Sequence, residues 1–178
     1  MTENELIEKM LNLLNKVKSE QSREKIFAEL EKEVLKAENF SLSYKFSKDI
    51  PGADIKKHEE VVMQSGDPQY NYLFAVSIPG VDIKKHEEVV IQSGDPNYNT
   101  LFAKDILGAD IKKHGEVVIQ SGNPKYNYLF AKDIPEADII RHYEILSSCN
   151  EVNYMKNLSE DYKCFTEASQ IIKAIRRK

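Results

Sequence analysis

The sequence has no tryptophan and only two cysteines, Cys149 and Cys164, which lie 15 positions apart. Because this spacing fits neither a disulfide framework nor a Cys-x-x-Cys metal motif, it predicts neither a disulfide-stabilised fold nor a zinc site. The longest apolar runs are far shorter than the roughly 18 residues that a membrane span needs. The acidic start, residues 1–5, does not resemble a secretion signal. We therefore expect a soluble, cytoplasmic protein without a membrane partner.

A basic excess is also missing, since the formal net charge is −4 at pH 7. Acidic residues outnumber basic ones over residues 38–150, whereas residues 151–178 are basic overall. A protein whose affinity comes mainly from DNA phosphates normally carries a clear basic excess. Nucleic acid is therefore disfavoured as a partner.

What the sequence does contain is a tandem repeat of 28 residues. Four copies align without a gap on a segment that begins with Asp-Ile and ends with His, at residues 54–58, 82–86, 110–114 and 138–142. A second block, which runs from a glycine to Leu-Phe-Ala, recurs in phase at residues 66–75, 94–103 and 122–131. Self-similarity with a fixed period is typical of repeat architectures.

The corners of the repeat carry helix-end residues. Gly66 suits the left-handed position after a helix, Asp67 can cap the next helix, and Pro68 fits the first helical turn. At the other corner, Pro51 and Gly52 end one helix. Each copy is thus predicted to form two helices, which are too short to be stable alone in water and must stack to bury their apolar faces.

The stacked Tyr-x-x-Leu-Phe-Ala and Glu-Val-Val cores resemble the short α-solenoid class that includes HEAT-like and tetratricopeptide-type arrays. The unit is shorter than the 34 residues of a tetratricopeptide repeat and lacks its tryptophan. We predict an all-α fold: a right-handed-type solenoid of stacked two-helix repeats with diverged capping helices at both ends. The resemblance implies a curved, rigid surface that binds another macromolecule.

We predict one domain over residues 1–178. Residues 1–37 would form N-terminal cap helices and a diverged repeat, because residues 22–37 fall in phase with the second helix of the repeat. Residues 38–150 would hold the core repeats, and residues 151–178 the C-terminal cap.

One histidine recurs in each copy: His58, His86, His114 and His142. Stacked helices lie about 8–10 Å apart, whereas zinc needs ligand nitrogens about 2 Å away. Neighbouring histidines are therefore too far apart to share an ion, and we predict a structural ladder at the border of the buried face, with pH sensing or ligand binding as the alternative. The asparagines Asn71, Asn99 and Asn127 recur too, which favours hydrogen bonding between repeats or contact with a partner.

No catalytic motif is present, and we expect neither enzyme activity nor a cofactor. Adjacent glutamates, such as Glu59 and Glu60, point about 100° apart on a helix and cannot converge on one substrate atom. We predict that they form a solvated face. Gly115 is the one glycine of the repeat that does not belong to a corner.

Positions separated by one turn on the first helix of each copy are predicted to face outward and to form a stripe of tyrosine and lysine, with packing of the tyrosines between neighbouring repeats as the alternative. Together with a second variable position near the start of that helix, they are our candidate partner-binding residues: Tyr44, Lys48, Tyr72, Lys104, Tyr128, Lys132, Gln69, Asn97 and Lys125. Tyrosine is enriched in binding hot spots, and aromatic rings among basic residues can also stack single-stranded bases.

These observations give two hypotheses for function. The first is a non-enzymatic protein-binding module, for example an inhibitor or adaptor that docks on a larger complex, as small acidic proteins of mobile elements do. The alternative is binding of single-stranded nucleic acid through the stripe and the basic tail at residues 173–178.

Overall fold

The computed structural model describes residues 2–149 and 152–161. Within these residues every regular element is an α-helix, and no strand is present. The chain divides into two compact units, one that ends at Ser93 and one that begins at Gly94. The basic segment 173–178 and Cys164 lie outside the described residues.

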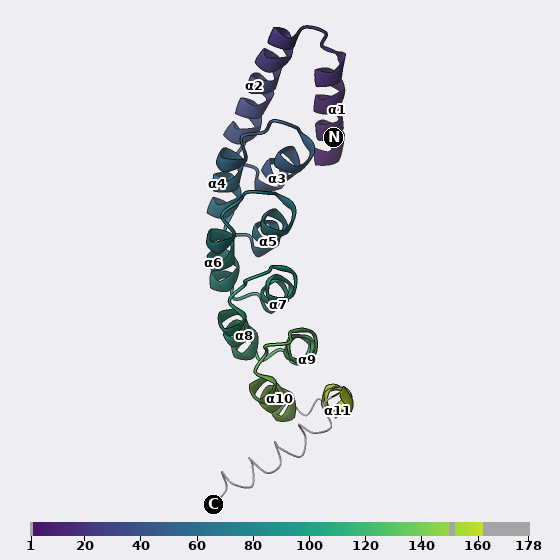
Figure 1. Ribbon diagram of the computed structural model, residues 1–178, viewed down its shortest axis with the longest axis vertical. Helices are drawn as coiled ribbons and strands as arrows, with labels where there is room; N and C mark the ends of the chain where they lie inside the picture. Colours follow the sequence, from purple (N-terminus) through teal and green to yellow (C-terminus); the bar gives the residue numbers. More distant parts are fainter. Residues whose placement is uncertain (1, 150–151, 162–178) are drawn as a thin grey trace, which may run out of the picture. The chain divides into compact units, whose positions relative to one another are not determined.

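The first unit consists of α1 (Glu3–Lys16), α2 (Glu20–Lys36), α3 (Phe40–Asp49), α4 (Ile55–Ser65), α5 (Pro68–Ser77) and α6 (Ile83–Ser93). Its helices form two rows, with α1, α3 and α5 in one row and α2, α4 and α6 in the other (Figure 1). Each helix packs on its partner in the other row and on the neighbours in its own row.

The second unit consists of α7 (Pro96–Asp105), α8 (Ile111–Gln120), α9 (Pro124–Asp133), α10 (Ile139–Ser148) and α11 (Val152–Asp161). Here α7, α9 and α11 form one row, and α8 and α10 form the other (Figure 1). Both units thus have the architecture of a helical repeat.

The corners follow the chemistry that the sequence predicts. Gly66 adopts the left-handed conformation, with φ +66°, after the last residue of α4. Asp67 then caps α5, because its carboxylate accepts a hydrogen bond of 3.0 Å from the amide of Tyr70. Pro68 occupies the first turn, where no amide donor is needed. The predicted helix pairs and their corners are confirmed.

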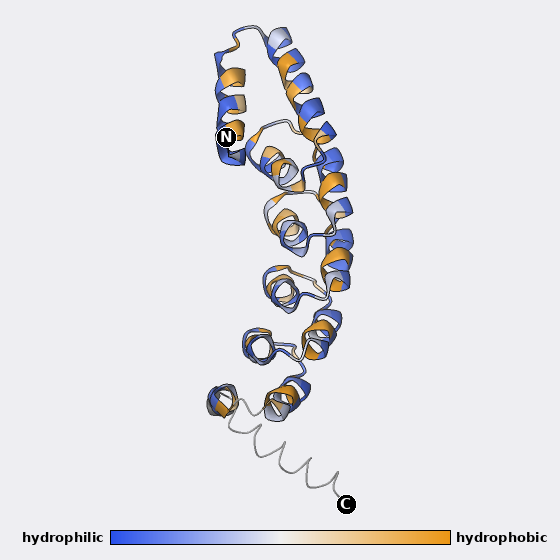
Figure 2. Cartoon of the chain, turned by 180° about the vertical axis from the view of Figure 1, so that it is seen from behind, coloured by the Kyte–Doolittle hydropathy of each residue, from blue (hydrophilic) through white to orange (hydrophobic). Residues whose placement is uncertain are grey.

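The core lies between the two rows of each unit. One phenylalanine per helix pair is completely buried: Phe46 and Phe74 in the first unit, and Phe102 and Phe130 in the second. The aliphatic residue at the centre of the facing helix, such as Val62 or Val118, is also completely buried. Hydrophobic and hydrophilic residues alternate along the helices (Figure 2), so each short helix is stabilised by packing one face on its neighbours.

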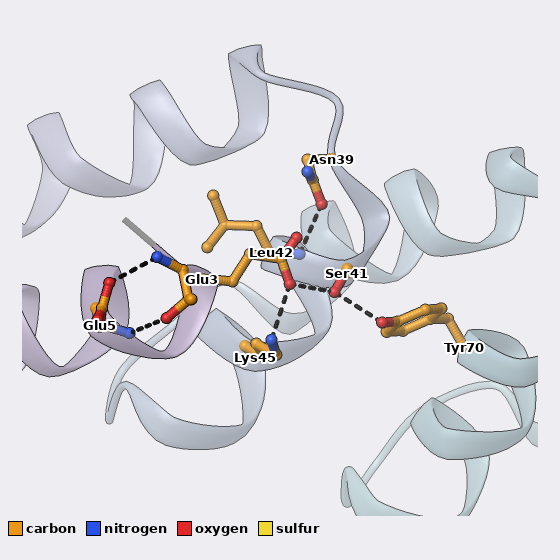
Figure 3. Close-up of polar contacts among 8 residues, drawn as sticks. Glu3, Glu5, Asn39, Ser41, Leu42, Lys45 and Tyr70 are labelled. Carbon is orange, nitrogen blue, oxygen red and sulfur yellow. Dashed lines mark hydrogen bonds and ion pairs between the residues drawn. The ribbon is translucent and has the colours of Figure 1, made fainter.

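A polar cluster holds the N-terminal helix on the repeat. The carboxylate of Glu3 in α1 accepts hydrogen bonds from Ser41 and Lys45 of α3, and Ser41 in turn accepts one from the hydroxyl of Tyr70 in α5 (Figure 3). The ammonium group of Lys45, 2.8 Å away, is the main reason that the pKa of Glu3 lies below its usual value. Three helices of one row are thereby tied together.

Both ends resemble the predicted caps within the described residues. In α2, Val34 is buried at the position that Val62 occupies in α4. In α11, Leu158 is buried and the ring of Tyr154 stacks on that of Tyr128 at 5.0 Å. The handedness of the solenoid and the single domain over residues 1–178 stay predictions.

Candidate binding site

Buried histidines and asparagines form the framework around the candidate site. Nδ1 of His86 in α6 lies 2.8 Å from Oδ1 of Asn71 in α5. The amide nitrogen of Asn71 donates to the backbone carbonyls of Val62 and Asp67, so its oxygen must accept a hydrogen bond from the Nδ1–H group of His86. The same bond joins His114 to Asn99 at 2.7 Å and His142 to Asn127 at 2.8 Å. His86, His114 and His142 thus each bond to an asparagine, whereas neither ring nitrogen of His58 has a hydrogen-bond partner, and a purely structural role of the ladder stays a prediction.

A glutamate approaches the other ring nitrogen. Oε1 of Glu59 lies 3.4 Å from Nε2 of His86 and accepts a hydrogen bond of 2.7 Å from the amide of Asp82, at the start of α6. One repeat earlier, Oε1 of Glu31 is 3.5 Å from Nε2 of His58 and 2.6 Å from the amide of Asp54. A carboxylate thus sits between a histidine and a helix N-terminus in two successive copies, where the partial positive charge of the helix end favours it.

The predicted solvated glutamate face is therefore wrong for half of its members. Glu59 and Glu87 are 8% and 4% exposed, whereas Glu60 and Glu88 are exposed as predicted. Adjacent helix positions do point in different directions, but one of the two points into the stack, where the amide at the start of the next helix donates to its carboxylate.

Beside His142, in the second unit, the repeat supplies no such glutamate carboxylate, because position 115 is glycine. A Cβ atom placed on Gly115 would lie 3.7 Å from Nε2 of His142 and 3.3 Å from the ring of Phe130. The Nε2 atom of His142 is buried and, like Nε2 of His58 and His86, has no hydrogen-bond partner. The space in front of it is part of a hollow of about 330 Å³, whose lining includes Gly115, Phe130, Asp138, Arg141 and His142. We call this space the notch.

A second hollow of about 430 Å³ adjoins the notch, and the two share Ile111 and Glu136 in their linings. Its apolar wall contains Ile106, Leu107 and Ile134. We call this second hollow the corner groove. Leu107, at its rim, is completely exposed.

Departures from the repeat meet at these two hollows. Leu107 stands where the other copies have Pro51, Pro79 and Pro135. Glu136 replaces the corner glycine found at positions 52, 80 and 108, and Gly115 replaces the glutamate found at positions 59 and 87. Since the other copies stack with the repeated residues, stacking does not explain these changes, and they identify the notch and the corner groove as the candidate site.

The electrostatics of the notch are set mainly by burial, which lowers the pKa of His142 to about 4. Asp138 and Glu116 act against this shift, whereas Arg141 adds to it. Both carboxylate oxygens of Glu116 are bonded to the guanidinium of Arg141. That carboxylate is therefore already paired beside the notch.

The predicted stripe of tyrosine and lysine is broken. Tyr44 and Tyr128 are only 7% and 9% exposed, and Thr100 is also buried. The prediction that they face outward is wrong because the rings pack between repeats: Tyr44 packs edge-on to Tyr70 at 5.8 Å, and Tyr128 stacks on Tyr154.

The remaining candidate residues lie near the surface. Lys48, Lys104, Lys132, Gln69 and Lys125 are exposed, whereas Tyr72 and Asn97 are half-buried. The ammonium groups of Lys48 and Lys132 lie over the rings of Tyr44 and Tyr128, at 5.6 and 5.5 Å from the ring centres. Lys104 is ion-paired with Asp133 at 2.8 Å. Their role in partner binding stays a prediction.

A larger hollow of about 540 Å³ lies in the first unit, beside Leu11, Leu14 and Phe27. None of its lining side chains is a buried polar group without a partner. Within the described residues, no group of three or more His, Cys, Asp or Glu side chains is placed to hold a metal ion. The notch and the corner groove therefore carry the more specific signal.

No protein-family model matches the chain, and no match was found among curated proteins or solved structures. Within the described part of the chain, no helix has both the length and the apolar character needed to cross a bilayer.

In the first unit, the position opposite His58 lacks the asparagine of the later copies, and this difference allows a prediction about stability. Ser43 stands where the later copies have asparagine, and both its Oγ atom and Nδ1 of His58 are buried without a hydrogen-bond partner. We expect Ser43→Asn to supply the missing acceptor and to raise the free energy of unfolding by about 1–2 kcal/mol. Urea unfolding followed by circular dichroism measures the change.

Ser43→Ala is the control, because it removes the unpartnered hydroxyl without supplying a partner for His58. We expect it to change stability by less than about 1 kcal/mol. A Ser43→Asn protein that is no more stable than Ser43→Ala would contradict the prediction.

Proposed function

We propose that this protein is a non-enzymatic helical-repeat module that binds another protein, and that the corner groove is part of its binding surface. The observation that carries the proposal is the complete exposure of Leu107 beside an apolar wall. Transfer of a leucine side chain from water into an interface contributes about 1.5–3 kcal/mol. Docking on a larger complex, as an adaptor or an inhibitor, is the form of binding that we propose.

The chemistry of the groove favours a partner segment that presents an apolar side chain. Ile106 and Ile134 in the wall are buried, so the groove offers an apolar surface that is anchored in the core. Lys104 and Glu136 line the same hollow and place opposite charges at its edge. An apolar anchor surrounded by polar residues is the usual anatomy of a protein interface.

Quantitative affinity capture from the native source tests this proposal with two matched variants. Leu107→Lys places a charge at the apolar rim, whereas the control Val76→Lys changes an exposed valine to the lysine that three other copies already have, at positions 48, 104 and 132. We expect Leu107→Lys to reduce capture of the specific partner at least about tenfold, which corresponds to about 1.4 kcal/mol, and Val76→Lys to leave it unchanged. Equal capture by both variants overturns the role of the groove.

Single-stranded nucleic-acid binding is less well supported. Base stacking needs exposed ring faces, and the predicted stripe lacks them because Tyr44 and Tyr128 are buried. An oligonucleotide titration at low salt, where phosphate-driven affinity is strongest, tests the alternative.

A further inference from the structure

The protein itself shows which group fits beside the ladder histidine. In the first unit the carboxylate of Glu59 occupies this space, 2.7 Å from the amide of Asp82 and 3.4 Å from Nε2 of His86. Glu31 occupies the equivalent space one repeat earlier. Both sites combine one ring nitrogen with one amide at the start of a helix.

The notch keeps these surroundings and lacks the carboxylate. His142 is completely buried, its Nδ1 is bound to Asn127, and its Nε2 has no hydrogen-bond partner. Nε2 of His86 has no hydrogen-bond partner either, but there the carboxylate of Glu59 fills the space in front of it. The amide of Asp138 precedes α10, a helix of 10 residues, at the position that Asp82 holds before α6. The ring of Phe130 forms a wall 3.3 Å from the place of the missing Cβ atom.

We propose that the notch binds a carboxylate group from outside the chain, supplied by an acidic side chain of a peptide or by a small carboxylic acid. Its oxygens would take the place of the missing glutamate, between Nε2 of His142 and the amide of Asp138. The inference goes beyond the proposed function, because a small acid can fill the notch when no protein is bound.

Binding of a carboxylate includes uptake of one proton. Since Nδ1 of the neutral His142 ring donates to Asn127, Nε2 carries a lone pair and must gain a proton from solvent before it can donate to a carboxylate. Burial, which keeps this ring neutral at pH 7, opposes that step. The other charged groups around the ring are Glu116 and Lys112 on α8, Glu136 before α10, and Asp138 and Arg141 at its start. Glu116 and Arg141 are paired with each other.

The affinity for a carboxylate should therefore rise as the pH falls from 7 to 5. Uptake of one proton gives a change of about tenfold per pH unit over this range. A neutral amide of the same shape binds without this proton and shows no such dependence.

Nitrogen NMR of the histidine rings in the full-length protein tests the proposal with propionate as the probe and propionamide as the neutral control. We expect propionate to shift Nε2 of His142 toward the protonated state, and to leave the ring of His86 unchanged because Glu59 already occupies that space. A His142 signal that does not respond to propionate at pH 5, or that responds equally to propionamide, overturns the proposal.

Two variants at position 115 separate occupation of the notch from general disturbance. Gly115→Glu and Gly115→Gln both fill the space, so both should abolish the response to propionate. Only the glutamate should also move His142 toward the protonated state without any probe. If propionate still shifts His142 in either folded variant, the carboxylate binds elsewhere and the proposal fails.

A capped glutamate, N-acetyl-glutamate methylamide, distinguishes the two sources. Tighter binding of this compound than of propionate assigns the notch to a peptide side chain, and tighter binding of propionate assigns it to a small acid. Neither result depends on capture of a protein through Leu107. The proposal for the notch and the proposal for the corner groove are therefore tested independently.

Discussion

Replacement of Asn127 by leucine is expected to lower the free energy of unfolding by about 3 kcal/mol, because it breaks three hydrogen bonds and leaves a buried donor unpaired. Asn127 accepts from Nδ1 of His142 at 2.8 Å and donates to the carbonyls of Val118 and Asn123 at 3.0 and 2.9 Å. For a chain of this size the loss corresponds to a decrease in melting temperature of about 10 °C. Thermal unfolding followed by circular dichroism measures it.

Lys125→Leu is the matched control. Lys125 lies on the same helix, α9, but is exposed. Exposed substitutions of this kind usually change stability by less than about 0.5 kcal/mol. If Asn127→Leu is no more destabilising than Lys125→Leu, the hydrogen-bonded ladder does not stabilise the fold.

Acid is expected to destabilise the protein between pH 6.5 and pH 4. Burial lowers the pKa of His58 and His86 and brings that of His142 to about 4 from its ordinary value of 6.5. The unfolded chain therefore binds protons that the folded chain does not, so the stabilisation is present above pH 6.5 and is lost as the pH falls to 4. His142 alone accounts for about 3 kcal/mol.

His142→Gln isolates this contribution, because glutamine does not titrate. The loss of stability between pH 7 and pH 4, obtained from urea unfolding at each pH, should be about 3 kcal/mol smaller in the variant than in the unsubstituted protein. Carboxylates also titrate in this range, but they do so in both proteins and cancel in the comparison. An equal loss in both proteins would show that His142 does not titrate on unfolding in this range.

The fold could be predicted from the sequence because its signals are local. Gly66, Asp67 and Pro68 specify a helix end, a cap and a first turn, and none of these depends on distant residues. The same three signals recur in the later copies of the repeat. The pairing of His86 with Asn71 is less local: the shared period of the two residues predicts a recurring role for each of them, but not that their side chains bond to each other.

Which side of each helix is buried and which is exposed could be predicted only in part. One turn of spacing places Tyr128 and Lys132 on the same strip of α9, but it does not say whether that strip meets solvent or the next helix of the row. The structure shows that the ring of Tyr128 meets Tyr154, while Lys132 reaches over the same ring into solvent. A long side chain can leave a buried position, whereas a tyrosine ring cannot.

The notch could not be predicted, although its signal is in the sequence. Gly115 is visibly the odd glycine of the repeat, but its meaning depends on where Glu59 points in the other copies. Once Glu59 is known to lie beside His86, the glycine at position 115 becomes a missing carboxylate. Comparison of Leu107 and Glu136 with the other copies would have found the corner groove in the same way.

The contacts of the recurring histidines also affect how the number of repeats in the protein can change. His86 finds its acceptor on Asn71 and its carboxylate on Glu59, and each of these three residues recurs at the same position in a repeated segment. A duplicated copy of residues 54–81 would therefore bring both halves of every such contact with it. We expect that adding one copy inside the first unit produces a longer protein that still folds, because a unit that is complementary to itself needs no compensating mutation.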